Sequence, residues 1–368
     1  MNKIKISKEK NNILKDIFIL SILFIAYICL VLRSYIIGSK VMILFFIILA
    51  VFCLAMVLFQ MIVFRNNVLA DWEERNIFYR LIVLIPDILI LLFVIPFGLS
   101  IVFYEVNFGH RVKLSEERLF DMSDKIVTEQ SYFPSNMGQK LCGVLYYMKE
   151  ESMDEVIVFC HGLGNSHKMY LNVIEYLVLN GYRVFSYDAT GYDKSEGISI
   201  KGMPQSIIDL SYAITYVKEK YSKDIILMGH SLGGYAVCSV IEDYPDVKAV
   251  VSLAGFNRSI DMIAYQGEQI IGSAIYPLLP FFSLYEAIKF GRYADYTGID
   301  GLSDMTGQVM ILHSEDDITV PIKNGYVLYE KRFGGDDRFT FLKSDQSGHD
   351  GLFMSGNAER ILLFLKNV

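Results

Sequence analysis

The residues 224–240, DIILMGHSLGGYAVCSV, hold the side chain best suited to covalent catalysis. An apolar run leads into Gly229-His230-Ser231-Leu232-Gly233, and small and apolar residues typical of a buried helix follow. The pattern G-x-S-x-G between a strand and a helix places a serine on a sharp turn, where the glycines let strand and helix approach closely. Serine is also a favoured helix N-cap, but a cap needs no flanking glycines. The pattern therefore predicts that Ser231 is a nucleophile.

The elements around this segment alternate between strand and helix. Such alternation requires a mostly parallel sheet covered on both faces, and the predicted fold class is therefore α/β. Strands are predicted at 139–148, 155–160, 182–187, 224–228, 247–253, 309–313 and 338–342, and helices at 168–180, 204–221, 232–244, 322–332 and 358–365.

Two segments interrupt this alternation. Residues 105–126 are predicted to form a charged, helical juxtamembrane connector. Residues 256–304 are rich in aromatics, and Pro277, Pro280, Glu286 and Lys289 break any apolar run long enough to cross a bilayer. We expect this segment to be a helical cap over the carboxyl edge of the sheet.

Residues 127–368 resemble an α/β-hydrolase and are similar to serine aminopeptidase and monoacylglycerol-lipase-like members. The resemblance is carried by G-x-S-x-G in its strand-turn-helix context. It extends to YDATGYDKSEG at 187–197, which matches the family's D-x-x-G-x-x-x-S-x-G turn through Asp188, Gly191, Ser195 and Gly197. Thr190 and Asp193 stand where the family usually has an arginine and a second glycine. We interpret this turn as structural support.

The resemblance implies an acid and a histidine base after the nucleophile, in that order. His349, in the polar loop SDQSGHDGLF before the final helix, matches the family's base. His313, the other histidine after Ser231, ends a strand and precedes the acid, so we expect it to be structural. The acid lies in ILHSEDDITVP, where Asp317 before the Val-Pro pair fits best and Asp316 is the second candidate.

The same resemblance assigns the oxyanion hole, which needs two N–H groups aimed at the developing charge. These are the N–H groups of Leu232, after the nucleophile, and of Leu163 in CHGLGNS. The alternative for CHGLGNS is an ordinary glycine-rich turn. His161 and His167 lack a helix-borne histidine pair or a carboxylate cluster, so we predict no metal and no cofactor.

The N-terminal residues 1–104 are predicted to be a multi-pass membrane anchor. Three long apolar runs, 17–32, 41–64 and 81–104, are separated by short charged segments, and the second and third are long enough to cross a bilayer. A cleaved signal peptide is the alternative for the first run, but no small-x-small cleavage site follows it. Asp87, inside the third run, is expected to have a packing role. Free buried thiols are expected for the cysteines.

Charge distinguishes the two parts of the chain. Residues 1–104 carry 10 Lys and Arg against 6 Asp and Glu (net +4), and the rest carries the remaining 24 basic and 35 acidic residues (net −11). An acidic soluble portion argues against nucleic acid as a partner. Lys and Arg cluster before the first run and in the loop between the second and third, which predicts that the hydrolase domain is extracytoplasmic.

These observations together predict a membrane-anchored serine hydrolase that cleaves a lipid or other acyl ester. A peptidase of the aminopeptidase type and an acyltransferase are alternatives with the same mechanism. An acidic cap residue such as Asp261 or Glu268, placed to bind an amino terminus, would favour the aminopeptidase. A catalytically silent membrane-bound binding or sensing domain is the alternative from a different class.

Overall fold

The computed structural model describes residues 90–113, 122–149, 152–353 and 356–368. The chain divides into two compact units, residues 1–102 and 103–368, and each is described by itself. The first two predicted membrane spans lie outside the described residues. Residues 90–104 of the third are helical: η2 (Ile90–Val94) is a π-helical turn, and α4 (Ile95–Phe108) continues from it into the second unit.

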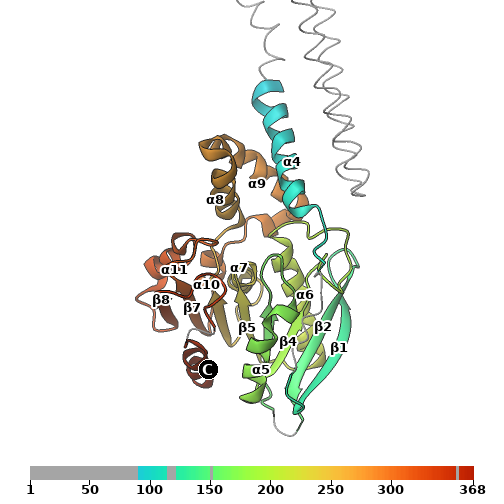
Figure 1. The fold of residues 1–368 in the computed structure, drawn as a ribbon, viewed down its shortest axis with the longest axis vertical. Helices are drawn as coiled ribbons and strands as arrows, with labels where there is room; N and C mark the ends of the chain where they lie inside the picture. Colours follow the sequence, from blue (N-terminus) through green and yellow to red (C-terminus); the bar gives the residue numbers. More distant parts are fainter. Residues whose placement is uncertain (1–89, 114–121, 150–151, 354–355) are drawn as a thin grey trace, which may run out of the picture. The chain divides into compact units, whose positions relative to one another are not determined.

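The second unit is built on an eight-stranded sheet (Figure 1). Its strands lie in the order β1-β2-β4-β3-β5-β6-β7-β8, and all pairs from β4 to β8 are parallel, whereas β2 is antiparallel to β1 and β4. The strands are β1 (Ile126–Pro134), β2 (Lys140–Met148), β3 (Val156–Cys160), β4 (Arg183–Tyr187), β5 (Ile225–His230), β6 (Ala249–Leu253), β7 (Gln308–Ser314) and β8 (Phe339–Ser344). The mostly parallel sheet confirms the predicted α/β class.

Helices cover both faces of this sheet. The helices α5 (Leu171–Leu179) and α12 (Ala358–Lys366) share one apolar core with side chains from β2 to β7. The helices α6 (Gln205–Lys220), α7 (Leu232–Ser239), α10 (Gly298–Ser303) and α11 (Tyr326–Phe333) form the other layer, in which α7 packs on β5 and β6. β3, β5 and β6 are buried along their whole length because both of their faces are covered.

The predicted cap segment folds as a series of short helices between β6 and β7. These are α8 (Ser259–Ile271), η5 (Gly272–Leu278), α9 (Leu279–Phe290) and η6 (Gly291–Ala294), followed by α10. Gly272 and Gly291 adopt φ of 62° and 57°, and each terminates the helix before it. By length and composition alone, the helical run Ser259–Ser303 is apolar enough to cross a membrane, because an 18-residue window within it has a mean hydropathy of 1.3. The turns divide it into shorter pieces.

Two parts of the sequence fold differently from expectation. The strand β1 was not predicted, because its residues IVTEQSYFP mix polar and apolar side chains at an exposed sheet edge. Within the described residues of the expected helical connector 105–126, helix α4 ends at Phe108. Beyond it, Val112 pairs with Tyr192, and the Arg111 guanidinium donates to the carbonyls of Gly197, Asp193 and Ser195. These tertiary hydrogen bonds outweigh the local helix propensity.

Candidate active site

Ser231 occupies a strained turn between β5 and α7. Its φ of 56° and ψ of −115° lie in a region of backbone conformation that residues other than glycine rarely adopt. Its side chain forms no cap hydrogen bond, which disfavours a role as helix N-cap. A Cβ on Gly229 would lie 2.3 Å from the Gly233 carbonyl oxygen, and one on Gly233 would lie 2.1 Å from that of Cys160. The two glycines are therefore required by the close approach of backbone at this turn.

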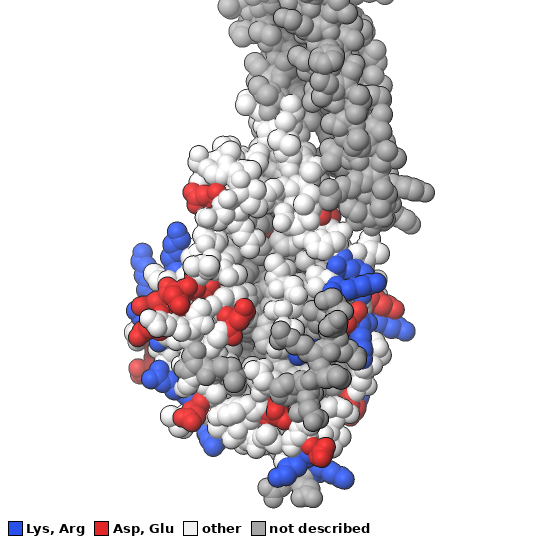
Figure 2. Space-filling view, in the orientation of Figure 1, with Lys and Arg blue, Asp and Glu red and all other residues white. Residues whose placement is uncertain are grey.

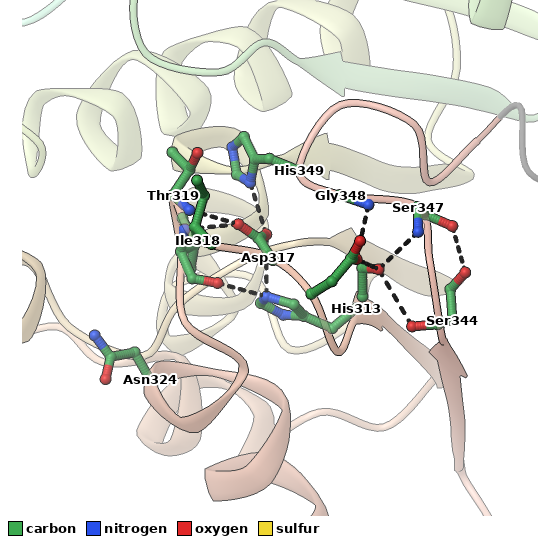
Figure 3. A network of polar contacts seen from close by, with 12 residues as sticks. His313, Asp317, Ile318, Thr319, Asn324, Ser344, Ser347, Gly348 and His349 are labelled. Atoms are coloured by element: carbon green, nitrogen blue, oxygen red, sulfur yellow. Dashed lines mark hydrogen bonds and ion pairs between the residues drawn. The ribbon is translucent and has the colours of Figure 1, made fainter.

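His349 and Asp317 meet at the carboxyl edge of the sheet (Figure 3). His349 lies in the loop after β8, and its Nδ1 is 2.7 Å from Oδ2 of Asp317, in the loop after β7. The Asp317 Oδ1 accepts the N–H groups of Thr319 and Val320, each at 2.9 Å. Burial raises the pKa of the Asp317 carboxyl, but hydrogen bonds from His313, His349 and Val320 lower it more, so the pKa lies well below its usual range. Asp317 is therefore an ionised, buried partner for His349.

The second candidate acid, Asp316, has other partners. Its Oδ1 accepts the Ser314 hydroxyl at 2.5 Å and the Gly348 N–H at 2.9 Å. Asp316 thus ties the loop that carries His349 to the end of β7. Of the two neighbouring carboxylates, Asp317 is the one that accepts the hydrogen bond of the His349 side chain.

A backbone turn that follows β3 lines the same cavity as the serine. His161 and Gly162 follow this strand, and the Ala189 N–H donates to His161 Nε2 at 3.0 Å. His167 Nδ1 lies 2.7 Å from Asp188 Oδ1, and both side chains are buried. The turn after β3 is in this way fixed to the turn after β4, which accords with the structural role predicted for Asp188.

Tyr170 and His230 support the site through hydrogen bonds, and no pattern in the sequence predicts this role. The Gly162 N–H donates to the Tyr170 hydroxyl at 3.1 Å, and that hydroxyl lies 2.9 Å from His230 Nδ1. His230 Nε2 lies 2.9 Å from the backbone oxygen of His349. Donation from Tyr170 to Nδ1 and from Nε2–H to the carbonyl gives a neutral His230. Burial, and then the neighbouring His349, lower the pKa of His230 to about 4.

Ser231 and His349 line one cavity of about 270 Å³ together with Leu163 and Leu232. Its other lining residues are Gly162, Asn165, His230, Phe256, Met262, Gln266, Thr319, Val320 and Asp350. Four of the five predicted site residues therefore line this cavity. The fifth, Asp317, does not line it but contacts His349 at Nδ1. Asp261 and Glu268 are not among the lining residues; Asp261 pairs with Arg258 at 2.7 Å.

One group of described residues has spacing suited to a metal ion: His230, His349 and Asp350. Both ring nitrogens of His230 already have hydrogen-bonding partners, the Tyr170 hydroxyl and the His349 carbonyl. The group therefore offers an ion too few available ligands for a tetrahedral site.

A serine on a strained strand-to-helix turn, at the carboxyl edge of a mostly parallel sheet with helices on both faces, is the arrangement of the α/β-hydrolase fold, and the chain has this fold. The family model for serine aminopeptidase, S33, matches residues 151–295. This segment contains Ser231 and ends before Asp317 and His349.

Esterases and lipases are among the known proteins that the chain resembles. The chain is 28% identical over 197 residues to lysophosphatidylserine lipase ABHD12 from Danio rerio, covering 50% of this chain and 49% of that protein. It is 26% identical over 118 residues to protein phosphatase methylesterase 1 from Candida albicans, covering 32% of each. The matches thus span about half or less of these relatives. The esterase Pf2001 from Pyrococcus furiosus has the same fold, with a TM-score of 0.54, 18% identity, and coverage of 70% of this chain and 98% of the esterase.

Proposed function

We propose that this protein is a membrane-anchored serine hydrolase that cleaves a lipid or other acyl ester through Ser231, His349 and Asp317. The observation that carries the proposal is the contact between His349 Nδ1 and Asp317 Oδ2, with Ser231 and His349 lining the same cavity. No cofactor enters the proposed reaction.

The mechanism follows from which nitrogen of His349 is engaged. Because Nδ1 donates to the Asp317 carboxylate, Nε2 carries the lone pair that takes the proton from the Ser231 hydroxyl. The serine oxygen attacks the ester carbonyl, and the N–H groups of Leu163 and Leu232 stabilise the oxyanion. His349 then protonates the leaving alcohol. Water, activated by the same nitrogen, hydrolyses the acyl-enzyme and frees Ser231.

The lining of the cavity supports an acyl ester as the substrate. Leu163, Leu232, Phe256, Met262 and Val320 provide apolar surface for an acyl chain. One of the relatives is named as a lysophosphatidylserine lipase and another as a methylesterase. An aminopeptidase is the second candidate, because the matching family model is that of serine aminopeptidases and the exposed carboxyl group of Asp350 lines the cavity.

The proposed location is a cell membrane, with three spans in residues 1–104 and the hydrolase domain outside the cytoplasm. The distribution of Lys and Arg supports this orientation. Protease accessibility of the domain in sealed cells or spheroplasts tests it. A domain cleaved only after the membrane is permeabilised would contradict the orientation.

A fluorophosphonate probe tests the activated serine. We expect the full chain in its membrane to be labelled, and Ser231→Ala and His349→Ala to lose the label. Ser259→Ala is a matched control, because Ser259 is a buried serine that lies outside the cavity lining. Labelled protein is then assayed on lysophospholipids, short acyl esters and aminoacyl amides. A folded wild type that takes no label would favour the silent binding domain.

A further inference from the structure

The outer surface of α8, η5 and α9 exposes apolar side chains over a long segment without an exposed charge. Residues 269–285 contain no Asp, Glu, Lys or Arg. Large apolar side chains stand in solvent along this segment and the next turn, with exposed fractions of 65% for Ile270, 48% for Tyr276, 49% for Leu284 and 59% for Ile288. In Figure 2 the region of α8 and α9 is mostly white, whereas charged groups lie over the rest of the domain. We call residues 269–288 the apolar tip.

The helix α9 differs from an ordinary surface helix because its inner face, which includes Phe282 and Phe290, also holds its charged residues. Its two charged residues, Glu286 and Lys289, point inward: Glu286 is 1% exposed and the Lys289 side chain is 17% exposed. Leu284 and Ile288 point outward. A helix that buries its charges and exposes its aliphatic side chains is stabilised in this arrangement by an apolar environment on its outer side.

Hydrogen bonds connect this helix to residues 104 and 105. Glu286 accepts the Tyr104 hydroxyl at 2.8 Å and the Ser259 hydroxyl at 2.6 Å. Glu105 accepts the Tyr285 hydroxyl at 2.6 Å and pairs with Lys289 at 2.5 Å. Tyr104 is the last residue of the third predicted span, so these buried bonds attach α9 to the point where the chain is expected to leave the bilayer.

We propose that the apolar tip lies in the interfacial layer of the same bilayer that holds the N-terminal anchor. The inference rests on the proposed membrane anchoring and goes beyond it, because an anchor alone does not determine which face of the domain meets the lipid. The attachment at Tyr104 and Glu105 supports this location, because Tyr104 is the predicted end of the third span. The burial of Glu286 and Lys289 removes the charges of α9 from the surface that would insert, and the exposed Glu268 lies at the border of the apolar tip, one residue before it.

The helix α8 then connects the lipid surface to the serine. Met262 and Gln266 line the cavity that contains Ser231, and Ile270, one further step of four residues along the helix, belongs to the apolar tip. Residues four apart lie on one face of a helix, and eight residues span about 12 Å. An acyl chain leaving the bilayer along this face reaches the cavity without crossing a charged side chain of α8, so the expected substrate is a membrane-resident lipid ester.

Quenching by brominated lipids tests the depth of the apolar tip. The sole tryptophan, Trp72, is replaced by phenylalanine, and a single new tryptophan is introduced as Leu284→Trp or, as a control, Leu179→Trp. Leu179 ends α5 and has an exposed fraction of 47%, close to the 49% of Leu284. The full chain is reconstituted in phosphatidylcholine vesicles with or without bromine on the acyl chains. We expect bromine to quench Leu284→Trp and to leave Leu179→Trp unchanged.

The outcomes separate this inference from the proposals on which it rests. Protein that a carbonate wash removes from the vesicles overturns the anchor and this inference together. Protein that resists the wash and takes the fluorophosphonate label, but shows no quenching at Leu284→Trp, overturns the inference alone. Equal quenching at both positions also overturns it.

A charge substitution supplies a functional readout. We expect Ile288→Glu to lower hydrolysis of a vesicle-borne ester about tenfold, the ratio given by 1.4 kcal/mol of lost insertion energy, with hydrolysis of a soluble short-chain ester unchanged. Leu179→Glu should change neither rate. Equal loss on both substrates would show that Ile288 serves the fold rather than contact with lipid.

Discussion

His313 Nε2 lies 3.3 Å from Oδ2 of Asp317, and both side chains are completely buried. The same nitrogen lies 2.9 Å from the Val320 carbonyl oxygen, so it carries a proton and His313 donates to both groups (Figure 3). The carboxylate that faces His349 is therefore held from a second side by another histidine. The sequence predicts a structural role for His313, and its contact with Asp317 specifies that role: His313 holds the carboxylate in position.

The proposed division of labour between the two neighbouring acids predicts unequal losses. Asp317→Asn should lower kcat/KM on a soluble ester by about 10⁴-fold, because His349 loses the partner that sets its tautomer. Asp316→Asn should lower it by less than about tenfold, because an amide oxygen still accepts from Ser314 and Gly348. Steady-state kinetics of both variants decide the assignment. A larger loss in Asp316→Asn would exchange the two roles.

The buried His230 predicts a loss of stability in acid. Its pKa is lowered to about 4 by burial and by His349, whereas an unfolded histidine titrates near 6.5. Between these pH values the unfolded chain binds a proton that the folded chain does not. The free energy of unfolding should therefore decrease as the pH is lowered from 6.5 to 4, by up to about 1.4 kcal/mol per pH unit. Denaturant unfolding in detergent should show a weaker pH dependence for His230→Asn.

Glu286 provides a comparison of opposite sign. Burial raises its pKa to about 7, although hydrogen bonds from Ser259 and Tyr104 act against this rise. Its contribution to stability is complete below about pH 4.5 and is lost as the pH rises toward 7. Glu286→Gln should therefore flatten the loss on the alkaline side of this window. If His230→Asn and Glu286→Gln changed the same side of the curve of unfolding free energy against pH, the opposite signs assigned to these two groups would be wrong.

The turn around Ser231 predicts a steric penalty for the smallest possible substitution. Gly233→Ala places a methyl group 2.1 Å from the Cys160 carbonyl oxygen, and overpacking of this kind should cost about 3 kcal/mol of unfolding free energy. Gly335→Ala is the matched control, because a Cβ there meets no atom within 4 Å, and its effect should stay within about 0.5 kcal/mol. An undestabilised Gly233→Ala would argue against the close strand-helix approach.

The cavity predicts how acyl-chain length can be restricted. Met262 lies on α8 and is 2% exposed where it lines the cavity with Ser231. Met262→Trp should reduce hydrolysis of long-chain esters about tenfold relative to acetyl esters, since the larger ring occupies acyl space. Met153→Trp, at an exposed position outside the lining, should leave the ratio unchanged. An unchanged ratio in Met262→Trp would place the acyl chain elsewhere.

The features that the sequence predicts correctly are those with a pattern within one short segment. The buried strands β3, β5 and β6 are short apolar runs, and the turn at Ser231 follows from its flanking glycines. Contacts between distant segments have no such local signal. The hydrogen bond between Tyr170 and His230 and the burial of Glu286 depend on how loops and cap helices pack. The spacing of residues along one segment does not encode this packing. The mixed edge strand β1 is missed because its pattern is weak.

The position of β8 at the end of the sheet has a consequence for biosynthesis. Ser231 follows the central strand β5, whereas His349 follows β8, the last strand in the order of the described sheet, next to β7. Synthesis proceeds from the N-terminus, so a nascent chain acquires the nucleophile well before it acquires the proposed base. In the proposed mechanism, every translation intermediate that ends before residue 349 lacks the base that activates Ser231, so hydrolysis can begin only after the loop that follows β8 has been added.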